Sequence, residues 1–442
     1  MSEISPERAA QFRRMREVAR ETFSSALKNA SIENAFARHV NCDRGVLRIC
    51  EDLHDLGSYS RVYVVSLGKA AHTMAQALEA QVGSRLEGIV ASSVAPAGQV
   101  RGFRYFQGGH PTPTLESIHA AEAVLKALSS PNAAALVIFM ISGGGSAIVE
   151  KPIDDEISLD DLIATYRVLV HSGAPIAEIN SIRKHLSAVK GGRLAQAAYP
   201  AQQVSILVSD VPDATPDALA SGPTMPDSTS IHDCERIAAK YGLVDRLPGS
   251  VAVLFRRRGL EETPKSDDPA FVRARWWTVL SNKIAIEEAA AAATKHGFAV
   301  EIDNSCDDWD YDRAADYLLN RLRDLRKSVS RVCLISGGEV TVTVRDGGTG
   351  GRNQQFALAC TGRIAGEDIT VLSAGTDGID GNSPAAGAVV DGSTVERAGG
   401  TEAVGQALAR FDSYPLLQSL GDTIVTGPTG NNLRDLRILL AY

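Results

Sequence analysis

The sequence predicts an α/β protein with two domains. A doubly wound, Rossmann-like parallel sheet is expected over residues 1–265, and a smaller α/β domain with a mixed sheet over residues 270–442. A chain of 442 residues is longer than one ordinary core, so two large domains fit its length. Apolar segments that lead into glycine turns and then helices are typical of buried parallel strands. Residues 341–344 alternate after a glycine turn, which favours a second sheet of mixed direction.

The N-terminal domain is expected to begin with two helices. Ser5 and Pro6 suit the N-cap and first position of a helix. Apolar residues then follow near helical spacing: Phe12, Met15, Val18, Phe23 and Leu27. A second helix is expected from Ser31. Buried strands are predicted at 62–67, 135–142 and 204–209, each ending at a glycine or polar turn.

A charged, proline-containing stretch between residues 256 and 275 is the best candidate for a linker between the domains. Regular patterns resume after it. A strand is expected at 277–280 and a helix at 284–295. Further strands are expected at 332–336, 340–344 and 369–373, and in the tail.

Composition and charge exclude several classes of protein. The formal net charge of −8 argues against general affinity for nucleic acid or anionic membranes. The six cysteines form no C-x-x-C pair, so we expect neither a zinc site nor a disulfide framework, and a cytoplasmic location. The longest apolar run, residues 133–141, is far shorter than the roughly 18 residues of a membrane span. Small-molecule substrates are the expected partners.

Glycine-rich loops after the predicted strands are candidates for binding phosphate. Glycine allows a phosphate to approach backbone N–H groups, and helix N-termini favour anions. The loop residues predicted to bind substrate or nucleotide are Gly68, Ser142, Gly143, Gly144, Gly145, Ser146, Gly337, Gly338 and Glu339. Each loop can also be a plain turn or allow close packing of helix on strand. Neither a P-loop motif nor G-x-G-x-x-G occurs, so P-loop chemistry and a dinucleotide site are not predicted.

Cationic side chains accompany these loops. Lys69 follows Gly68, and Arg352 ends a glycine-rich segment that could act as a mobile arm and bring the guanidinium onto a transferred phosphoryl group. Residues 180–193 concentrate positive charge, which suits an anionic ligand or simply a solvated helix face. The binding candidates outside the glycine loops are His110, Asn180, Arg183, Lys184 and Lys190.

Three aspartates, Asp210, Asp377 and Asp380, come just after apolar strands, where open α/β sheets bind ligands. Such carboxylates can hold Mg²⁺ or accept a proton from a substrate hydroxyl. Asp380 precedes a glycine, and this pair is more typical of a turn.

Short motifs occur in order along nearly the whole chain: LGKA at 67–70, GHP at 109–111, SGGGSA at 142–147, IRKHLS at 182–187 with KGG at 190–192, ASGPT at 220–224, GRNQ at 351–354, GTDG at 375–378 and TGPTG at 426–430. With these motifs the chain resembles the class II glycerate 2-kinases, whose C-terminal half is called the MOFRL domain. The resemblance implies transfer of the γ-phosphoryl group of ATP to the 2-hydroxyl of D-glycerate, with Mg²⁺, in a cleft between two α/β domains.

The family's reactive lysine, loop arginine and aspartate match Lys69, Arg352 and Asp377. The resemblance implies that the two cations stabilise the transferred phosphoryl group, and that Asp377 activates or orients the hydroxyl or helps to hold the metal. Asp210 is a second candidate for metal binding. Binding candidates within the matched motifs also include Asn353, Thr376 and Thr429.

The chain departs from the family pattern in three places, which favours a shifted substrate preference or slower turnover. Residues 213–215 read DAT where the family has a glycine and two aspartates, so Asp210 is the weaker metal candidate. Residues 382–384 read NSP, and Asn431 replaces a threonine. Two alternatives stay open: an NAD(P)H-dependent hydroxypyruvate reductase, or a nucleotide- or metabolite-binding protein without turnover.

Overall fold

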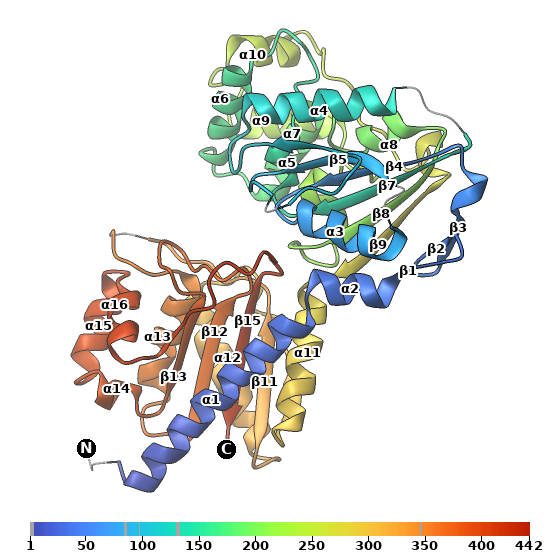
Figure 1. Ribbon diagram of the computed structural model, residues 1–442. Helices are drawn as coiled ribbons and strands as arrows, with labels where there is room; N and C mark the ends of the chain where they lie inside the picture. The colour runs from blue at the N-terminus through green and yellow to red at the C-terminus, as the bar shows by residue number, and fades with distance from the viewer. Residues whose placement is uncertain (1–3, 84–85, 97, 130–132, 345–346) are drawn as a thin grey trace. The chain divides into compact units, whose positions relative to one another are not determined.

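The computed structural model describes residues 4–83, 86–96, 98–129, 133–344 and 347–442 (Figure 1). The chain forms two compact units. We call Ile32–Val279 the Rossmann-like unit, and Met1–Ser31 together with Leu280–Tyr442 the mixed-sheet unit. No helix among the described residues has the length and apolar character needed to cross a membrane.

The Rossmann-like unit is built on a six-stranded sheet. Its strand order is β6 (Phe103–Gln107), β5 (Glu87–Ser92), β4 (Arg61–Leu67), β7 (Ala135–Ser142), β8 (Gln202–Val208) and β9 (Ala274–Leu280). The pairings from β6 to β8 are all parallel. In chain order this is 3-2-1-4-5-6, the order of doubly wound dinucleotide-type sheets, and it confirms the predicted fold class. The strand order reverses between β4 and β7, and doubly wound sheets bind ligands beyond the carboxyl ends of the strands at such a reversal.

Helices cover both faces of this sheet. Figure 1 shows α3 (Ala71–Val82) on one side and α4 (Leu115–Leu128) on the other. The other helices of the unit are α2 (Ile32–His39), α5 (Gly145–Ile148), α6 (Leu159–Val170), α7 (Ile176–His185), α8 (Arg193–Ala198), α9 (Ile231–Lys240) and α10 (Gly249–Arg256), with short 3₁₀ turns at Leu56–Ser58, Pro216–Ser221 and Pro269–Phe271. A small antiparallel sheet contains β1 (Val40–Asp43), β2 (Val46–Ile49) and β3 (Asp52–Asp55).

The mixed-sheet unit has the strand order β10 (Ala299–Ile302), β11 (Val332–Gly337), β15 (Asp435–Ala441), β12 (Ile369–Gly375), β13 (Gly387–Asp391) and β14 (Thr423–Ile424). Only β10 and β11 pair in parallel, and the other pairs are antiparallel. The sheet is therefore mixed, as predicted, but the predicted strand at 340–344 is wrong. Thr341 forms a single bridge to Asp310, and the antiparallel pairs are made by β15 with β11 and β12 and by β13 with β12 and β14.

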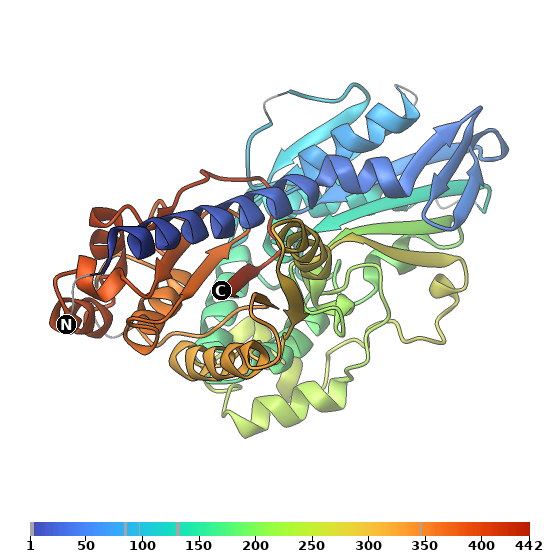
Figure 2. The ribbon, with the colours of Figure 1, turned by 90° about the horizontal axis from the view of Figure 1, so that it is seen from below.

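Two helix layers enclose the mixed sheet. On one face, α1 (Pro6–Asn29) packs with α11 (Asn282–Lys295), and Figure 2 shows α1 lying along the strands. On the other, α12 (Tyr311–Arg326) and α13 (Arg352–Arg363) contribute to a shared core with β11, β12 and β15. The unit also contains α14 (Thr394–Arg397), α15 (Thr401–Ala409) and α16 (Ser413–Ser419).

The first helix starts where the sequence predicts but belongs to the other half of the molecule. Ser5 Oγ accepts the N–H of Arg8, and Pro6 occupies the first turn. Helix α1 packs on α11, β12, β13 and β15, so residues 1–31 join the mixed-sheet unit instead of the domain assigned over 1–265. The predicted linker between the domains is also wrong. Residues 256–275 contain the last residue of α10, the buried Phe271 and the first residues of β9, all within the Rossmann-like unit.

Candidate functional site

Three predicted loops of the Rossmann-like unit meet at the strand-order reversal. Gly68 and Lys69 follow β4, residues 142–146 follow or end β7, and Asp210 follows β8. The Lys69 N–H donates to the Gly143 carbonyl at 2.8 Å. A Cβ on Gly68 would lie 2.3 Å from Ser142 Oγ, and one on Gly143 would lie 1.9 Å from Asp210 Oδ2. The glycines are thus required for close approach, which brings the Lys69 and Asp210 loops together. We call this group the switch-point cluster.

His110 belongs to the same cluster. A Cβ on Gly144 would lie 2.9 Å from His110 Cδ2 and 3.1 Å from Lys69 Cγ, so the histidine and the lysine flank this glycine. Burial, and to a lesser extent the positive charge of Lys69, lower the pKa of His110 below its ordinary value. A neutral imidazole beside a cation can donate or accept one hydrogen bond without competing for a negative ligand.

Arg183 reaches the cluster from α7. Its Nη2 donates to Ser146 Oγ at 2.9 Å, and Ser146 Oγ lies 2.9 Å from Ser221 Oγ. The guanidinium lies over the Tyr166 ring, 4.4 Å from its centroid. Ser221 and Tyr166 were not among the predicted site residues, because they are distant in sequence and only tertiary packing brings them here. Asn180, also predicted, is half-buried one turn earlier on α7.

The two other predicted lysines of this segment are engaged inside the protein. Lys190 is buried against the buried carboxylate of Glu150, and burial lowers the pKa of Lys190 to about 8. Lys184 Nζ donates to Asp217 at 2.9 Å and to Asp227 at 3.2 Å. Both lysines therefore neutralise internal acids, and the structure does not present them to a ligand as the sequence analysis expected.

In the mixed-sheet unit, β11 and β12 end at the edge where β15 begins, and this edge carries Glu339, Arg352 and Asp435. Arg352 donates to Asp435 from Nε at 2.6 Å and from Nη2 at 3.0 Å. Its Nη2 also lies 2.8 Å from Glu339 Oε1. Such a bidentate ion pair fixes the plane of a guanidinium. Arg352 is thus held in one orientation.

The glycine loop before Arg352 is also held. Thr349 N–H donates to Asp412 at 2.8 Å, and Gly350 N–H donates to Asn382 at 2.9 Å. A Cβ on Gly350 would lie 2.3 Å from Ser413 Oγ. The loop is therefore packed against its neighbours, in contrast to the mobile arm that its composition suggested.

The loop after β11 does not offer its amides to a phosphate in this structure. Gly337, Gly338 and Glu339 donate their N–H groups to Asn304, Asn282 and Asp307, at 2.8, 3.0 and 3.0 Å. A Cβ on Gly337 would lie 2.0 Å from Asn282 Oδ1, and Gly338 has a positive φ of 81°. These glycines serve packing, the alternative that the sequence left open, and they place Glu339 against Arg352.

Asp380 is more than a turn residue. It is 2% exposed, and its two oxygens accept the backbone N–H groups of Asn353 and Gln354 at 3.0 and 2.9 Å. Both side-chain amides donate to it as well. Its carboxylate therefore caps the first turn of α13, directly beside Arg352, and Asn353 acts through this cap. Burial raises the pKa of Asp380 to about 6.

The remaining predicted residues form the β12 end of the site. Thr376 Oγ1 donates to the Arg434 carbonyl at 2.8 Å, and Thr429 Oγ1 donates to the Thr376 carbonyl at 2.7 Å. Both threonines thus support the loop. Asp377 Oδ1 accepts the N–H of Ile379 at 3.1 Å, and Asp377 lines a pocket.

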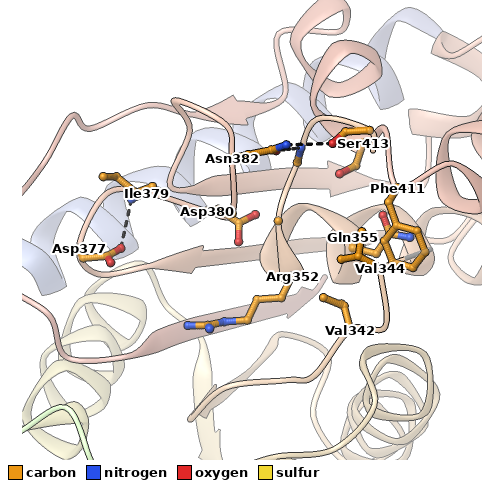
Figure 3. A pocket seen from close by; sticks show the side chains of 14 residues that line it. Val342, Val344, Arg352, Gln355, Asp377, Ile379, Asp380, Asn382, Phe411 and Ser413 are labelled. Atoms are coloured by element: carbon orange, nitrogen blue, oxygen red, sulfur yellow. Dashed lines mark hydrogen bonds between the residues drawn. The ribbon is translucent and has the colours of Figure 1, made fainter. Parts of the chain in front are cut away.

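This pocket has a volume of about 550 Å³. Figure 3 shows Arg352 and Asp377 toward one end and Phe411 with Val344 at the other. Its lining residues are Val342, Val344, Gly348, Gly350, Gly351, Arg352, Gln355, Asp377, Ile379, Asp380, Gly381, Asn382, Phe411 and Ser413. The sequence alone does not reveal its apolar end, because valine and phenylalanine carry no chemical signature that separates a ligand wall from a core.

The described residues contain no cluster of three or more histidine, cysteine, aspartate or glutamate side chains suited to a metal ion. Mg²⁺ commonly takes only one or two protein carboxylates and completes its shell with substrate phosphates and water. Asp377 and Asp210 lie in different units, and each has the oxygen ligands that such an ion prefers.

The chain is similar to known proteins along most of its length. Residues 18–256 match a domain of unknown function, DUF4147, and residues 332–435 match the MOFRL family. A D-glycerate 2-kinase from Thermotoga maritima is 36% identical over 86% of this chain and 90% of its own length. A protein from Agrobacterium vitis, provisionally named a hydroxypyruvate reductase, is 37% identical over 86% of this chain and 87% of its own.

The fold is also shared with a solved structure. The crystal structure of a glycerate kinase from Thermotoga maritima matches with a TM-score of 0.84 and 32% identity. The match covers 97% of this chain and all of the other. Both units therefore have counterparts in one protein.

Proposed function

We propose, since the chain belongs to the glycerate 2-kinase family, that it transfers the γ-phosphoryl group of ATP to the 2-hydroxyl of D-glycerate, giving 2-phosphoglycerate and ADP. The observation that supports this most is that the family's lysine, arginine and aspartate motifs each occupy the ligand-binding end of a sheet. Lys69 lies at the switch point of one unit. Arg352 and Asp377 lie at the pocket of the other.

In this proposal Lys69 and Arg352 lower the energy of the transferring phosphoryl group by neutralising its oxygens. Arg352 is suited to this role because Asp435 and Glu339 hold it in advance, so little reorganisation is needed during the reaction. Arg183 and Ser146 at the switch-point cluster are suited to an anionic substrate group such as a carboxylate.

Asp377 orients the substrate hydroxyl or receives its proton as the hydroxyl oxygen bonds to phosphorus and the bond to ADP breaks. The same carboxylate would hold Mg²⁺ together with the nucleotide phosphates, with Asp210 as a second candidate. A bound magnesium ion would supply neutralisation of phosphate charge.

The direct test is ADP release from ATP and Mg²⁺ with D-glycerate, L-glycerate and related hydroxy acids, with the phosphorylated product assigned by ³¹P NMR. Lys69→Met and Arg352→Lys should each lower kcat by about 10²–10³-fold. Lys126→Met, on the exposed end of α4, is the matched control and should behave as wild type. Absence of D-glycerate-dependent ADP formation would refute the proposal, and normal turnover in a variant would remove that residue from the mechanism.

The Agrobacterium vitis relative supports one alternative, reduction of hydroxypyruvate by NAD(P)H. The chain lacks the G-x-G-x-x-G turn that such a Rossmann site uses for pyrophosphate. Oxidation of NADPH by hydroxypyruvate would favour this alternative. A rise in melting temperature with ATP or glycerate, without any ADP formation, would favour a binding protein.

A further inference from the structure

The pocket beside Arg352 is larger than the hydroxy acid requires. Its volume of about 550 Å³ is in the range of pockets that enclose drug-sized or nucleotide-sized ligands. A three-carbon acid would fill a small part of this space and would offer nothing apolar to its far end. The size of the pocket therefore favours the phosphoryl donor as its occupant.

The far end of the pocket has an aromatic and aliphatic wall. Phe411, Val342 and Val344 line it, and Figure 3 shows the Phe411 ring beside Val344 and Gln355. Phe411 has a left-handed backbone with φ of 52°, which is unfavourable for a bulky residue. A Cβ on Gly348 would lie 2.4 Å from the Phe411 carbonyl oxygen, so this glycine permits the packing that holds Phe411 in place. Planar bases stack well on such aromatic rings.

A buried acceptor belongs to the same wall. Gln355 is 1% exposed and lines the pocket from the second turn of α13. Its Nε2 donates to the Leu408 carbonyl at 2.9 Å, which identifies the other amide atom as the oxygen. Within the described residues, Gln355 Oε1 has no hydrogen-bond partner, nor does Ser413 Oγ at the same pocket. A buried acceptor without a donor is unfavourable, and a ligand N–H would satisfy it.

We propose that this pocket holds the adenine base of the phosphoryl donor. The ring packs on Phe411 and Val344, its amino group donates to Gln355 Oε1, and the phosphates extend toward Arg352. Gln355 Oε1 is buried in the free protein, so a side chain of the wall turns aside when the base enters. The inference rests on the proposed kinase function and adds the donor subsite to it.

The experiment combines binding and turnover. Calorimetry with ADP reports on the pocket without any phosphoryl transfer, and KM values for ATP and D-glycerate separate the two substrates. Phe411→Leu should weaken ADP binding and raise the KM for ATP by about tenfold, as loss of a stacking partner does, while the KM for D-glycerate stays unchanged. Val344→Ser should act in the same direction, and it decides the case if the Phe411 variant does not fold.

The hydrogen bond between the adenine amino group and Gln355 can be tested with inosine triphosphate, which has an oxygen in place of that amino group. Wild type should prefer ATP over inosine triphosphate by about tenfold or more in kcat/KM, because the oxygen cannot donate to Gln355. Gln355→Met should erase this preference. Gln406→Met, the same change at an exposed position on α15, should keep it.

The outcomes separate the inference from the proposed function. Unchanged ADP affinity and KM in a folded Phe411 or Val344 variant, or a raised KM for D-glycerate alone, would overturn the donor subsite while the kinase function stands. An equal preference for the two nucleotides in wild type would overturn the role of Gln355. Weakened ADP binding in the variants, without glycerate-dependent turnover in wild type, would support the subsite and refute the kinase function.

Discussion

Asp380 lies beside Arg352 at the start of α13, and its carboxylate caps the first turn of the helix that carries Arg352. The carboxylate of Asp380 accepts hydrogen bonds from the two residues that follow Arg352. A negative charge at the first turn is favourable for a helix, but here it is buried and a second carboxylate, Asp435, lies nearby. Above about pH 6 this buried carboxyl is ionised, and its ionisation lowers the free energy of unfolding of the protein.

The first prediction concerns the pH dependence of stability due to Asp380. Burial raises its pKa to about 6 in the folded chain, whereas the unfolded value is about 3.9. The folded state binds the proton more tightly in this window, so the contribution of Asp380 to the unfolding free energy falls as the pH rises from about 4 to 6. We expect Asp380→Asn to remove a decrease of about 2 kcal/mol between pH 4.5 and 7.5.

Urea unfolding of wild type and Asp380→Asn at several pH values measures this difference. Ser413→Ala, which changes a side chain of the same pocket that carries no titratable group, is the control and should keep the wild-type slope. Parallel pH profiles of wild type and Asp380→Asn would show that Asp380 titrates as an ordinary carboxyl.

At the scale of elements, three glycine loops with similar sequences have different structural roles. The loop at 142–145 brings β4, β7 and β8 together at the switch point. The loop at 337–338 has its amides bonded to side-chain oxygens. The loop at 347–351 packs on residues 410–413 to form a pocket wall. Side chains from distant parts of the chain determine which backbone N–H groups of these loops are already hydrogen-bonded.

The second prediction tests the switch-point loop. Gly143→Ala places a Cβ 1.9 Å from Asp210 Oδ2, so the loop or the β8 turn must move. We expect kcat/KM for D-glycerate to fall at least about tenfold, because small displacements at a reacting centre are costly. The melting temperature should also fall, since the packing of two strand ends is strained.

Gly249→Ala is the matched control in the same unit. A Cβ at Gly249 meets no atom within 4 Å, and the position is the first of α10. This variant should keep full activity and gain slight stability, as alanine in a helix does. Wild-type activity in Gly143→Ala would show that the loop does not position a reacting group.

At the scale of the whole molecule, the chain builds one unit from two separated segments. It leaves the mixed-sheet unit after Ser31, forms the Rossmann-like unit, and returns at Leu280. Helix α1 buries Phe12, Met15, Val18 and Phe23. Each such side chain contributes about 1.5–3 kcal/mol on burial, so their sum is comparable to the usual stability of a domain, about 5–15 kcal/mol.

The third prediction follows from this connectivity. A fragment of residues 32–279 should fold alone, with a cooperative thermal transition followed by circular dichroism. A fragment of residues 280–442 should lack such a transition, and joining residues 1–31 to it through a short linker should restore one. Stable folding of residues 280–442 without α1 would contradict the assignment of that helix.

The sequence predicted three strands of the Rossmann-like sheet, β4, β7 and β8, because apolar strands buried on both faces are continuous and end at conspicuous turns. It did not predict β5 and β6, and it assigned the strand at 277–280, which is the end of β9, to the other domain. It could not predict that 340–344 is irregular, because alternation over a few residues is also produced by a segment that lines a pocket. The sequence also could not predict the boundary after residue 31, because the apolar face of a helix does not indicate which sheet the helix will cover. Lys184 and Lys190 were predicted as ligand contacts because buried acids from other segments cannot be paired with them by sequence alone.

Local chemistry was determined by the sequence itself: strand, glycine turn and helix in alternation, the order of the family motifs, and the residue types able to meet a phosphate. Those features depend on neighbours along the chain. Tertiary structure decided which cations face a ligand and which neutralise buried acids, which loop amides have acceptors, and which valines and phenylalanine form a pocket wall. These outcomes depend on contacts between residues tens to hundreds of positions apart, where burial and hydrogen-bond geometry set the energies.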